Sequence, residues 1–136
     1  MEPHVTLHAY LSFDDAPAGM RWLEHLGFES VARQADDNGR IVHAELRLGQ
    51  AVVMLATSNA AYDVPALKGD STGGGLYLVT QNVDDLYNRA VQAGGRSVLA
   101  PEDTDWGSRR ARVLDPEGHE WSFGSYAPGR QWSSED

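Results

Sequence analysis

The chain has 136 residues, of which 41% are hydrophobic and 23% charged, and this composition predicts one ordinary globular domain. It contains no cysteine, which excludes disulfides, thiolate zinc sites and cysteine nucleophiles. Eleven lysines and arginines against twenty acidic residues give a net charge of −9, which disfavours nucleic acid and favours a cationic ligand, although acidity also serves solubility alone. No apolar run approaches the roughly 18–20 residues of a membrane span, and the first residues lack the features of a signal peptide. We therefore expect a cytoplasmic protein that does not bind membranes.

Residues 5–57 form the first predicted module, which consists of a strand, a helix and three further strands. Apolar and polar side chains alternate over 5–13, as is typical of a half-buried strand. Residues 14–17, Asp-Asp-Ala-Pro, predict the start of a helix, because an aspartate cap and a proline in the first turn are both favoured there. Gly27 predicts the end of this helix. Further strands are expected over 28–34, 40–48 and 51–56.

The spacing of apolar side chains predicts which faces of these elements are buried. The inward stripe of the helix is expected to consist of Ala16, Met20, Leu23 and Leu26, with Trp22 packed beside it. In the strand over 40–48, the residues expected to face the helix are Val42, Ala44, Leu46 and Leu48. The alternate residues His43, Glu45 and Arg47 are expected on the opposite face. Asn38 and Gly39 predict a tight turn before this strand.

The second module is expected over 74–126, after a linker at 58–73 that shows no sustained periodicity. Its helix is expected to follow Asn82 and to end at Gly94. Pro101 is expected to end the next strand, before a loop that contains Trp106. The predicted strands cover 76–80, 96–100, 109–114 and 119–124, and a polar tail follows over 127–136.

A sequence repeat with an offset of 67 residues relates the two modules, because Tyr10-Leu11 recurs as Tyr77-Leu78 and Gly27 as Gly94. A repeat of this length with the same order of elements indicates a duplicated half-domain rather than a solenoid unit. The predicted fold is therefore α+β, with two tandem βαβββ modules that form a curved mixed sheet around a central cleft. Functional residues are expected on the faces that line this cleft.

Several segments carry a resemblance when they are taken in order: 10–16, 26–29, 39–46 and 106–124, the last with Asp-Pro-Glu-Gly-His at 115–119. Their order and spacing resemble the vicinal-oxygen-chelate superfamily. That superfamily includes glyoxalase I, fosfomycin-resistance enzymes, extradiol dioxygenases and the bleomycin-binding antibiotic-resistance proteins. The resemblance implies the duplicated fold described above. It also implies a homodimer, with clefts that lie between modules within one chain or are shared by two chains.

The resemblance further implies where a divalent metal would bind, because the superfamily's enzymes take His, Glu, His and Glu from the first and last strands of the modules. The matching positions here are His8, with Leu7 as an alternative register, then Val53 or Met54, Gly75 and Ser122. At most one of these is a ligand, whereas metal sites in enzymes need about three protein ligands. We therefore expect neither a metal nor another cofactor at the inherited site. A relocated ligand set stays open: His8, His43, Glu45 and Glu120.

If the polar side of each strand faces the cleft, two tyrosines and mixed charges line it. These predicted ligand-binding residues are His8, Tyr10, Ser12, His43, Glu45, Arg47, Tyr77, Arg110, Arg112, Glu120 and Ser122, with Trp106 as a lid or stacking wall. Such residues form either cross-strand charge pairs on a solvated face, for example Glu120 with Arg112, or a pocket for a flat polar molecule. Trp121 is expected to face the helices, and His119 to be a solvated turn residue.

Two functions are compatible with these residues. The first is a metal-independent protein, similar in design to the bleomycin-type resistance proteins, that sequesters a small aromatic or cationic compound. The second is an enzyme, either a lyase, isomerase or dioxygenase with a relocated metal or a metal-free acid–base catalyst at His8 or His43. The missing ligands favour the first function. Arg110 and Arg112 indicate the opposite ligand charge, since paired arginines attract a carboxylate or phenolate.

Overall fold

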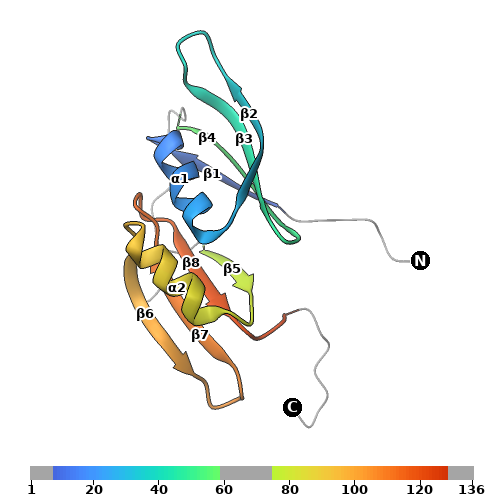
Figure 1. Ribbon diagram of the computed structural model, residues 1–136, viewed down its shortest axis with the longest axis vertical. Helices are drawn as coiled ribbons and strands as arrows, with labels where there is room; N and C mark the ends of the chain where they lie inside the picture. Colours follow the sequence, from blue (N-terminus) through green and yellow to red (C-terminus); the bar gives the residue numbers. More distant parts are fainter. Residues whose placement is uncertain (1–7, 59–74, 129–136) are drawn as a thin grey trace, which may run out of the picture.

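Two βαβββ modules follow one another along the chain (Figure 1). The computed structural model describes residues 8–58 and 75–128. The first module consists of β1 (Ala9–Phe13), α1 (Ala16–Leu26), β2 (Glu29–Ala35), β3 (Ile41–Leu48) and β4 (Ala51–Thr57). The second consists of β5 (Gly75–Val79), α2 (Val83–Gln92), β6 (Arg96–Asp103), β7 (Arg109–Leu114) and β8 (Glu120–Gly124). The predicted α+β class and the duplicated order of elements are confirmed, whereas the predicted linker lies outside the described residues apart from Ser58.

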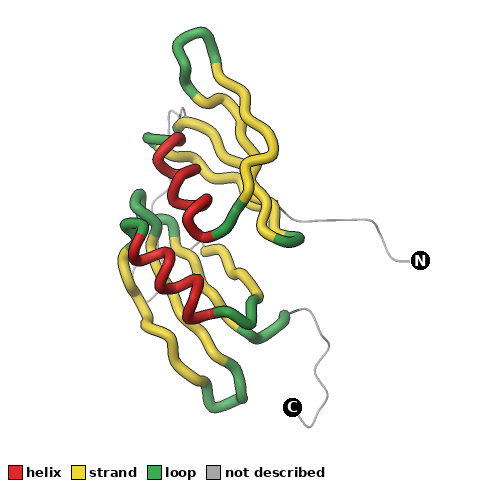
Figure 2. The backbone as a smooth tube through the Cα atoms, viewed as in Figure 1, coloured by secondary structure: helices red, strands yellow, loops and turns green. Residues whose placement is uncertain are grey.

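The strands of each module form a separate four-stranded mixed sheet (Figure 2). The strand orders are β1-β4-β3-β2 and β5-β8-β7-β6. β1 runs parallel to β4 and β5 runs parallel to β8, while the other neighbours are antiparallel. The first strand of each module therefore lies at one edge of its sheet, and β2 and β6 lie at the opposite edges.

Each helix covers one face of its own sheet, and the two helices lie side by side (Figure 1). The predicted stripe of α1 is buried, and it joins residues of both modules in one hydrophobic core. The rings of Trp22 and Trp121 lie 5.7 Å apart in this core, and Trp22 Nε1 donates a hydrogen bond of 3.2 Å to the carbonyl oxygen of Ala90. Burial of one large apolar side chain stabilises a fold by about 1.5–3 kcal/mol. The tryptophan pair therefore holds the two modules together.

Local sequence signals position several of these elements as predicted. The carboxylate of Asp15 accepts the N–H of Ala18 at 3.1 Å and caps α1, while Gly27 ends that helix in the left-handed region with φ 114°. The turn between β2 and β3 contains Gly39 with φ 82°, as the Asn-Gly pair predicts. No helix within 8–58 or 75–128 is long and apolar enough to cross a membrane.

Two predictions about the strands are wrong. Val42 was expected to face α1 but is 43% exposed, whereas its neighbour Ile41 is 1% exposed. The pairing of β2 with β3 changes register at this end of the sheet, which reverses the alternation there. Pro101 does not end its strand, because β6 continues to Asp103. β6 is an edge strand, where the missing N–H of a proline can face away from the sheet.

Candidate functional site

We call the face of a sheet that its helix does not cover the open face. The open face of the second sheet brings together five of the predicted ligand-binding residues. Tyr77 lies opposite Ser122, and Ser122 lies opposite Arg112. Successive side chains of a strand point to opposite faces, so residues two apart share a face. The module-two open face therefore consists of Tyr77, Arg110, Arg112, Glu120 and Ser122, with Trp106 beside it on the loop between β6 and β7.

A cavity of about 230 Å³ hollows the module-two open face. Tyr77, Trp106 and Tyr126 contribute aromatic rings to its lining, and Arg112 and Ser122 contribute polar groups. Trp106 is 64% exposed, so a ligand in the cavity can reach this residue. A concave aromatic surface with a few convergent polar groups is typical of small-molecule sites.

The position of Tyr77 depends on two residues that sequence analysis did not identify. Its hydroxyl donates a hydrogen bond of 2.6 Å to the carbonyl oxygen of Tyr126, while burial raises the pKa of that hydroxyl. A side chain at position 124 would overlap the Tyr77 ring, so Gly124 gives the ring room over β8. Gly124 lies opposite Val79, the last residue of β5, the strand that also carries Tyr77. A glycine within a strand indicates that another group packs closely against it, and this was the available signal for the contact.

Arg112 joins the two neighbouring strands β7 and β8. Its Nε donates a hydrogen bond of 3.1 Å to Ser122 Oγ and lies 3.7 Å from Glu120 Oε1, so the predicted pair of Glu120 and Arg112 is confirmed. Glu120 is only 7% exposed and lies against Gly75, where a Cβ atom would come within 2.9 Å of Oε1. The carboxylate therefore fills the space that a side chain at position 75 would need.

Arg109, which also lines the cavity, is held between two carboxylates. Its Nε lies 2.7 Å from Asp84 Oδ1, and one terminal nitrogen lies 3.0 Å from Asp103 Oδ1. The hydrogen bond from Arg109 lowers the pKa of Asp84, and the bond to Asp84 is the largest of the effects that raise the pKa of Arg109. This arginine is therefore already neutralised within the protein.

Arg110 follows the same pattern, because one of its terminal nitrogens lies 2.8 Å from Glu102 Oε1. Its Cζ atom also lies 5.6 Å from the centre of the Trp106 ring. The three arginines of the cavity thus face four carboxylates: Asp84, Asp103, Glu102 and Glu120. The arginines line the cavity and these carboxylates do not, but the pairing reduces the attraction of each arginine for an anion.

The open face of the first sheet contains the remaining predicted residues: His8, Tyr10, Ser12, His43, Glu45 and Arg47. Tyr10 lies opposite Met54, and Met54 lies opposite Glu45, which places the side chains of β1, β4 and β3 in one row across this module-one open face. Tyr10 and Ser12 line a second cavity, of about 250 Å³. This cavity lies on the first sheet, whereas the cavity of about 230 Å³ lies on the second. His8 is exposed directly before β1.

The other three residues of this face form side-chain pairs outside the cavity. His43 Nε2 lies 2.7 Å from Glu45 Oε2, and both side chains are about one-third exposed. Arg47 lies 3.9 Å from Glu29 across the pair of β3 and β2. Exposed pairs of this kind contribute about 0–1 kcal/mol to stability.

The four positions implied for a divalent metal do not fit one. Met54 and Gly75 offer no hard donor, and the hydroxyl of Ser122 accepts the hydrogen bond from Arg112. The relocated set is not brought together either, since His43 and Glu45 lie in the first sheet and Glu120 in the second. Within the described parts of the chain, no three His, Asp or Glu residues are grouped so that they could hold a metal ion.

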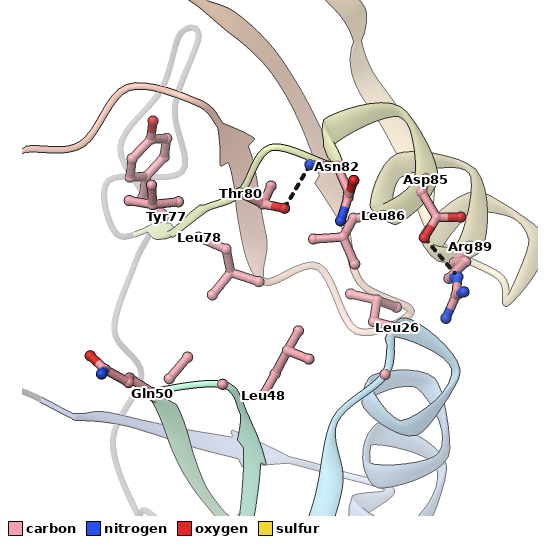
Figure 3. A pocket seen from close by; sticks show the side chains of 14 residues that line it. Leu26, Leu48, Gln50, Tyr77, Leu78, Thr80, Asn82, Asp85, Leu86 and Arg89 are labelled. Atoms are coloured by element: carbon pink, nitrogen blue, oxygen red, sulfur yellow. Dashed lines mark hydrogen bonds and ion pairs between the residues drawn. The ribbon is translucent and has the colours of Figure 1, made fainter.

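A groove of about 610 Å³ lies between the two modules (Figure 3). Leu26 and Leu48 of the first module face Leu78 and Leu86 of the second across this groove. The ion pair of Asp85 and Arg89 and the side chain of Gln50 lie at its margin. Sequence analysis expected a cleft between the modules but, apart from Tyr77, identified none of the residues that line this groove as binding residues, because no pattern within one module predicts how two modules pack.

The turn over 115–119 reaches from the second module to the first. His119 Nδ1 lies 2.9 Å from Asp115 Oδ2, and His119 Nε2 lies 3.0 Å from the carbonyl oxygen of Ser12. The carboxylate of Glu117 accepts the backbone N–H groups of residues 14 and 15 at 2.7 and 2.8 Å. The expectation that His119 is a solvated turn residue is therefore wrong, because its side chain is only 25% exposed and contacts Phe13 and Ser12 of the first module. The hydrogen bond to Asp115 is the main effect that raises the pKa of His119.

Comparisons with known proteins agree with this architecture. Residues 4–123 match the family model described as the Glyoxalase/Bleomycin resistance protein/Dioxygenase superfamily. An uncharacterized protein of Mycobacterium bovis is 34% identical over 134 residues, which cover 91% of this chain and 84% of the relative. The crystal structure of TioX from Micromonospora sp. ML1 has a TM-score of 0.70 at 30% identity, over 93% of this chain and 100% of that chain. A family enzyme from Burkholderia phytofirmans PsJN shares the fold, with a TM-score of 0.60 at 16% identity over 86% of this chain and 94% of its own.

Proposed function

The chain belongs to the glyoxalase/bleomycin resistance protein/dioxygenase superfamily, and we propose that it is a metal-independent protein that sequesters a small aromatic or cationic compound on its module-two open face. The cavity of that face carries the proposal, because the rings of Tyr77 and Trp106 lie there beside the hydrogen-bonded pair of Arg112 and Ser122. Aromatic rings offer a large contact area to a flat ligand, and a few fixed polar groups orient it.

The donor set supports metal-independent binding. Glu120, the carboxylate of the last strand, is already engaged by Arg112 and packed against Gly75. A metal would need about three protein ligands, and the positions around this carboxylate offer a glycine and a hydroxyl. The residues of this face are therefore arranged to contact an organic molecule directly.

A second copy of the chain completes the site in this proposal. The cavity of one open face, about 230 Å³, is smaller than the roughly 300–1,000 Å³ of typical ligand pockets. In the described chain, β1 pairs only with β4 and β5 only with β8, and unpaired strand edges favour association with another chain. A symmetric pair of chains would bring Tyr10 of the module-one open face, which is 57% exposed, opposite the partner's module-two open face.

The assembly is tested by size-exclusion chromatography with light scattering. A dimer gives close to twice the chain mass of 14.9 kDa. A monomer at concentrations of tens of micromolar would contradict a cleft that two chains share, and would leave each open face as a separate shallow site.

Ligand binding is tested with a panel of planar aromatic compounds of both charges. A ligand should quench tryptophan fluorescence and raise the melting temperature with occupancy. Replacement of Trp106 by Ala should weaken binding by about 1–3 kcal/mol, or about 5- to 150-fold. Val91→Ala is the matched control, because Val91 is exposed on α2 and thus on the covered side of the sheet. A panel without any binder, or binding that Trp106→Ala does not weaken, would contradict the proposal.

One observation favours a second function, which is metal-free acid–base catalysis on the module-one open face. His43 Nε2 lies 2.7 Å from Glu45 Oε2, and a carboxylate at one ring nitrogen orients a histidine for proton transfer at the other. This function predicts turnover of a bound compound that His43→Gln abolishes while binding persists. A compound recovered unchanged after prolonged incubation with the protein would exclude it.

A further inference from the structure

A guanidinium group of the protein itself lies over the exposed ring of the module-two open face. Arg110 Cζ is 5.6 Å from the centre of the Trp106 ring, within the range of a cation–π interaction. The same guanidinium is held by Glu102, whose Oε1 lies 2.9 Å from Nε and 2.8 Å from a terminal nitrogen. An aromatic ring and a carboxylate are thus arranged around one planar cation.

The backbone defines the positions of both groups. Glu102 lies directly opposite Arg110 in the pairing of β6 with β7. The loop that carries Trp106 is closed by hydrogen bonds between Thr104 and Ser108, of 2.8 Å between the backbones and 3.0 Å from the Ser108 N–H to the Thr104 hydroxyl. The backbone therefore keeps the two positions that carry the ring and the carboxylate near each other when the arginine side chain moves.

We infer that Trp106 and Glu102 form a binding site for a planar organic cation, an amidinium or guanidinium joined to an aromatic ring, and that Arg110 occupies this site until the ligand displaces it. The inference rests on the proposed function and names the class of ligand that this face takes. In the complex, the ligand's cation lies over Trp106 and hydrogen bonds to Glu102, while its ring extends into the cavity toward Tyr77.

Displacement of Arg110 requires little free energy. The side chains of Arg110 and Glu102 are 47% and 43% exposed, and ion pairs this accessible to water contribute little to stability. The exchange replaces one planar cation by another, so neither the ring nor the carboxylate loses a partner. An anionic ligand could displace Glu102 from Arg110 in the same way, but it would then lie beside the Trp106 ring, whose face attracts cations and not anions.

The experiment uses a matched pair of probes, 2-naphthamidine, which is cationic, and its neutral isostere 2-naphthamide. Dissociation constants for both are measured by calorimetry with the full chain, and the ratio of the two affinities is the readout. The ratio should favour the amidine about fivefold or more and should fall when salt is raised. Glu102→Gln should lower it at least threefold, because the counter-ion is lost. Arg110→Gln should raise it at least threefold, because the competing cation is lost while the side-chain length is kept.

The outcomes distinguish failure of the cation site from failure of the proposed function. A ratio near one in the wild type, or one that Glu102→Gln leaves unchanged, overturns the cation site. If in that case both probes still bind and Trp106→Ala weakens both, the proposed function stands without the cation site. If neither probe binds, both proposals lose their support. Val91→Ala should give the wild-type ratio, and melting temperatures of the variants show whether each remains folded.

Discussion

The two open faces share one backbone plan but differ in what they offer a ligand. The module-two open face combines a cavity, an exposed tryptophan and arginines that are each paired with carboxylates. The module-one open face also has a cavity, lined by the exposed Tyr10, but it has no tryptophan among its described residues and fewer charged pairs, of which the closest is His43 with Glu45. The connections before β3 and β7 both have five residues and a glycine with positive φ, Gly39 and Gly107. The difference between them therefore lies in their side chains, since Trp106 stands before Gly107 where Asn38 stands before Gly39. The two modules thus share one scaffold, and Trp106 gives one of them an exposed aromatic ring at this turn.

The turns before the last strand of each module differ in a similar way. In the second module, the turn over 115–119 binds the first module through His119 and Glu117. In the first module, the turn at Gly49 and Gln50 only lines the groove between the modules. One turn therefore joins the modules, whereas the other leaves a surface available to a partner.

The largest expected effect separates the shared core from the open face. Trp121 is fully buried against Trp22, so Trp121→Ala should destabilise the fold by about 3–5 kcal/mol. Trp106→Ala should change stability by about 0.5 kcal/mol or less, since the ring is mostly exposed. Urea unfolding of both variants measures the difference. Equal losses of stability would show that the Trp106 loop is part of the core rather than of a binding surface.

A mixture of two variants tests whether the two open faces meet across a dimer. Tyr10→Ala and Trp106→Ala should each weaken binding by about 1–3 kcal/mol when studied alone. If a cleft consists of one face from each chain, a mixed dimer contains one intact cleft and one with both defects. After subunit exchange, about a quarter of the clefts should therefore bind with wild-type affinity. A mixture without any recovery would place the whole site within one chain.

His119 gives the joint between the modules a pH dependence. Both of its ring nitrogens face acceptors, so the protonated ring makes one more hydrogen bond than the neutral ring. Its pKa is raised above 6.5 in the folded protein, so this stabilisation is complete below pH 6.5 and is lost as the pH rises through the folded-state pKa. His119→Gln should reduce the free energy of unfolding by about 1–2 kcal/mol near pH 6 and by less at higher pH. Stability profiles that remain parallel between wild type and variant would show that this charge makes no difference.

The smallest expected effect concerns the ion pair of Arg47 and Glu29 on the module-one open face. The two groups are 3.9 Å apart and mostly exposed. Arg47→Ala should therefore change the free energy of unfolding by less than about 0.5 kcal/mol, and salt should remove even that difference. A loss above 1 kcal/mol would show that this exposed pair contributes to stability, and would contradict the account of the module-one open face.

The sequence predicted the fold well because its signals act within a few residues. The cap at Asp15, the left-handed Gly27 and the apolar stripe of α1 each depend on neighbours along the chain, and all three are confirmed. The predictions failed where tertiary pairing decides the outcome. Val42 is exposed because β2 and β3 change register, and Pro101 continues a strand because β6 lies at an edge.

The candidate site was predicted in part for the same reason. Alternation along β5, β7 and β8 was enough to place Tyr77, Arg112 and Ser122 on one face. It was not enough to show that Glu102 neutralises Arg110, since that pair depends on the register between two strands. The contact of His119 with Ser12 was also beyond reach, because it depends on how the modules pack.

The central claim is that this protein binds its ligand without a metal, and a binding isotherm measured with and without metal tests it most directly. The tightest compound of the aromatic panel is titrated into protein that has been treated with a chelator, and then into the same protein with one equivalent of Zn, Ni, Mn or Fe. The account predicts the same dissociation constant in every case, with the compound recovered unchanged and Trp106→Ala as the variant that weakens binding. Binding that the chelator abolishes and one equivalent of metal restores, or metal-dependent turnover of the compound, would contradict it.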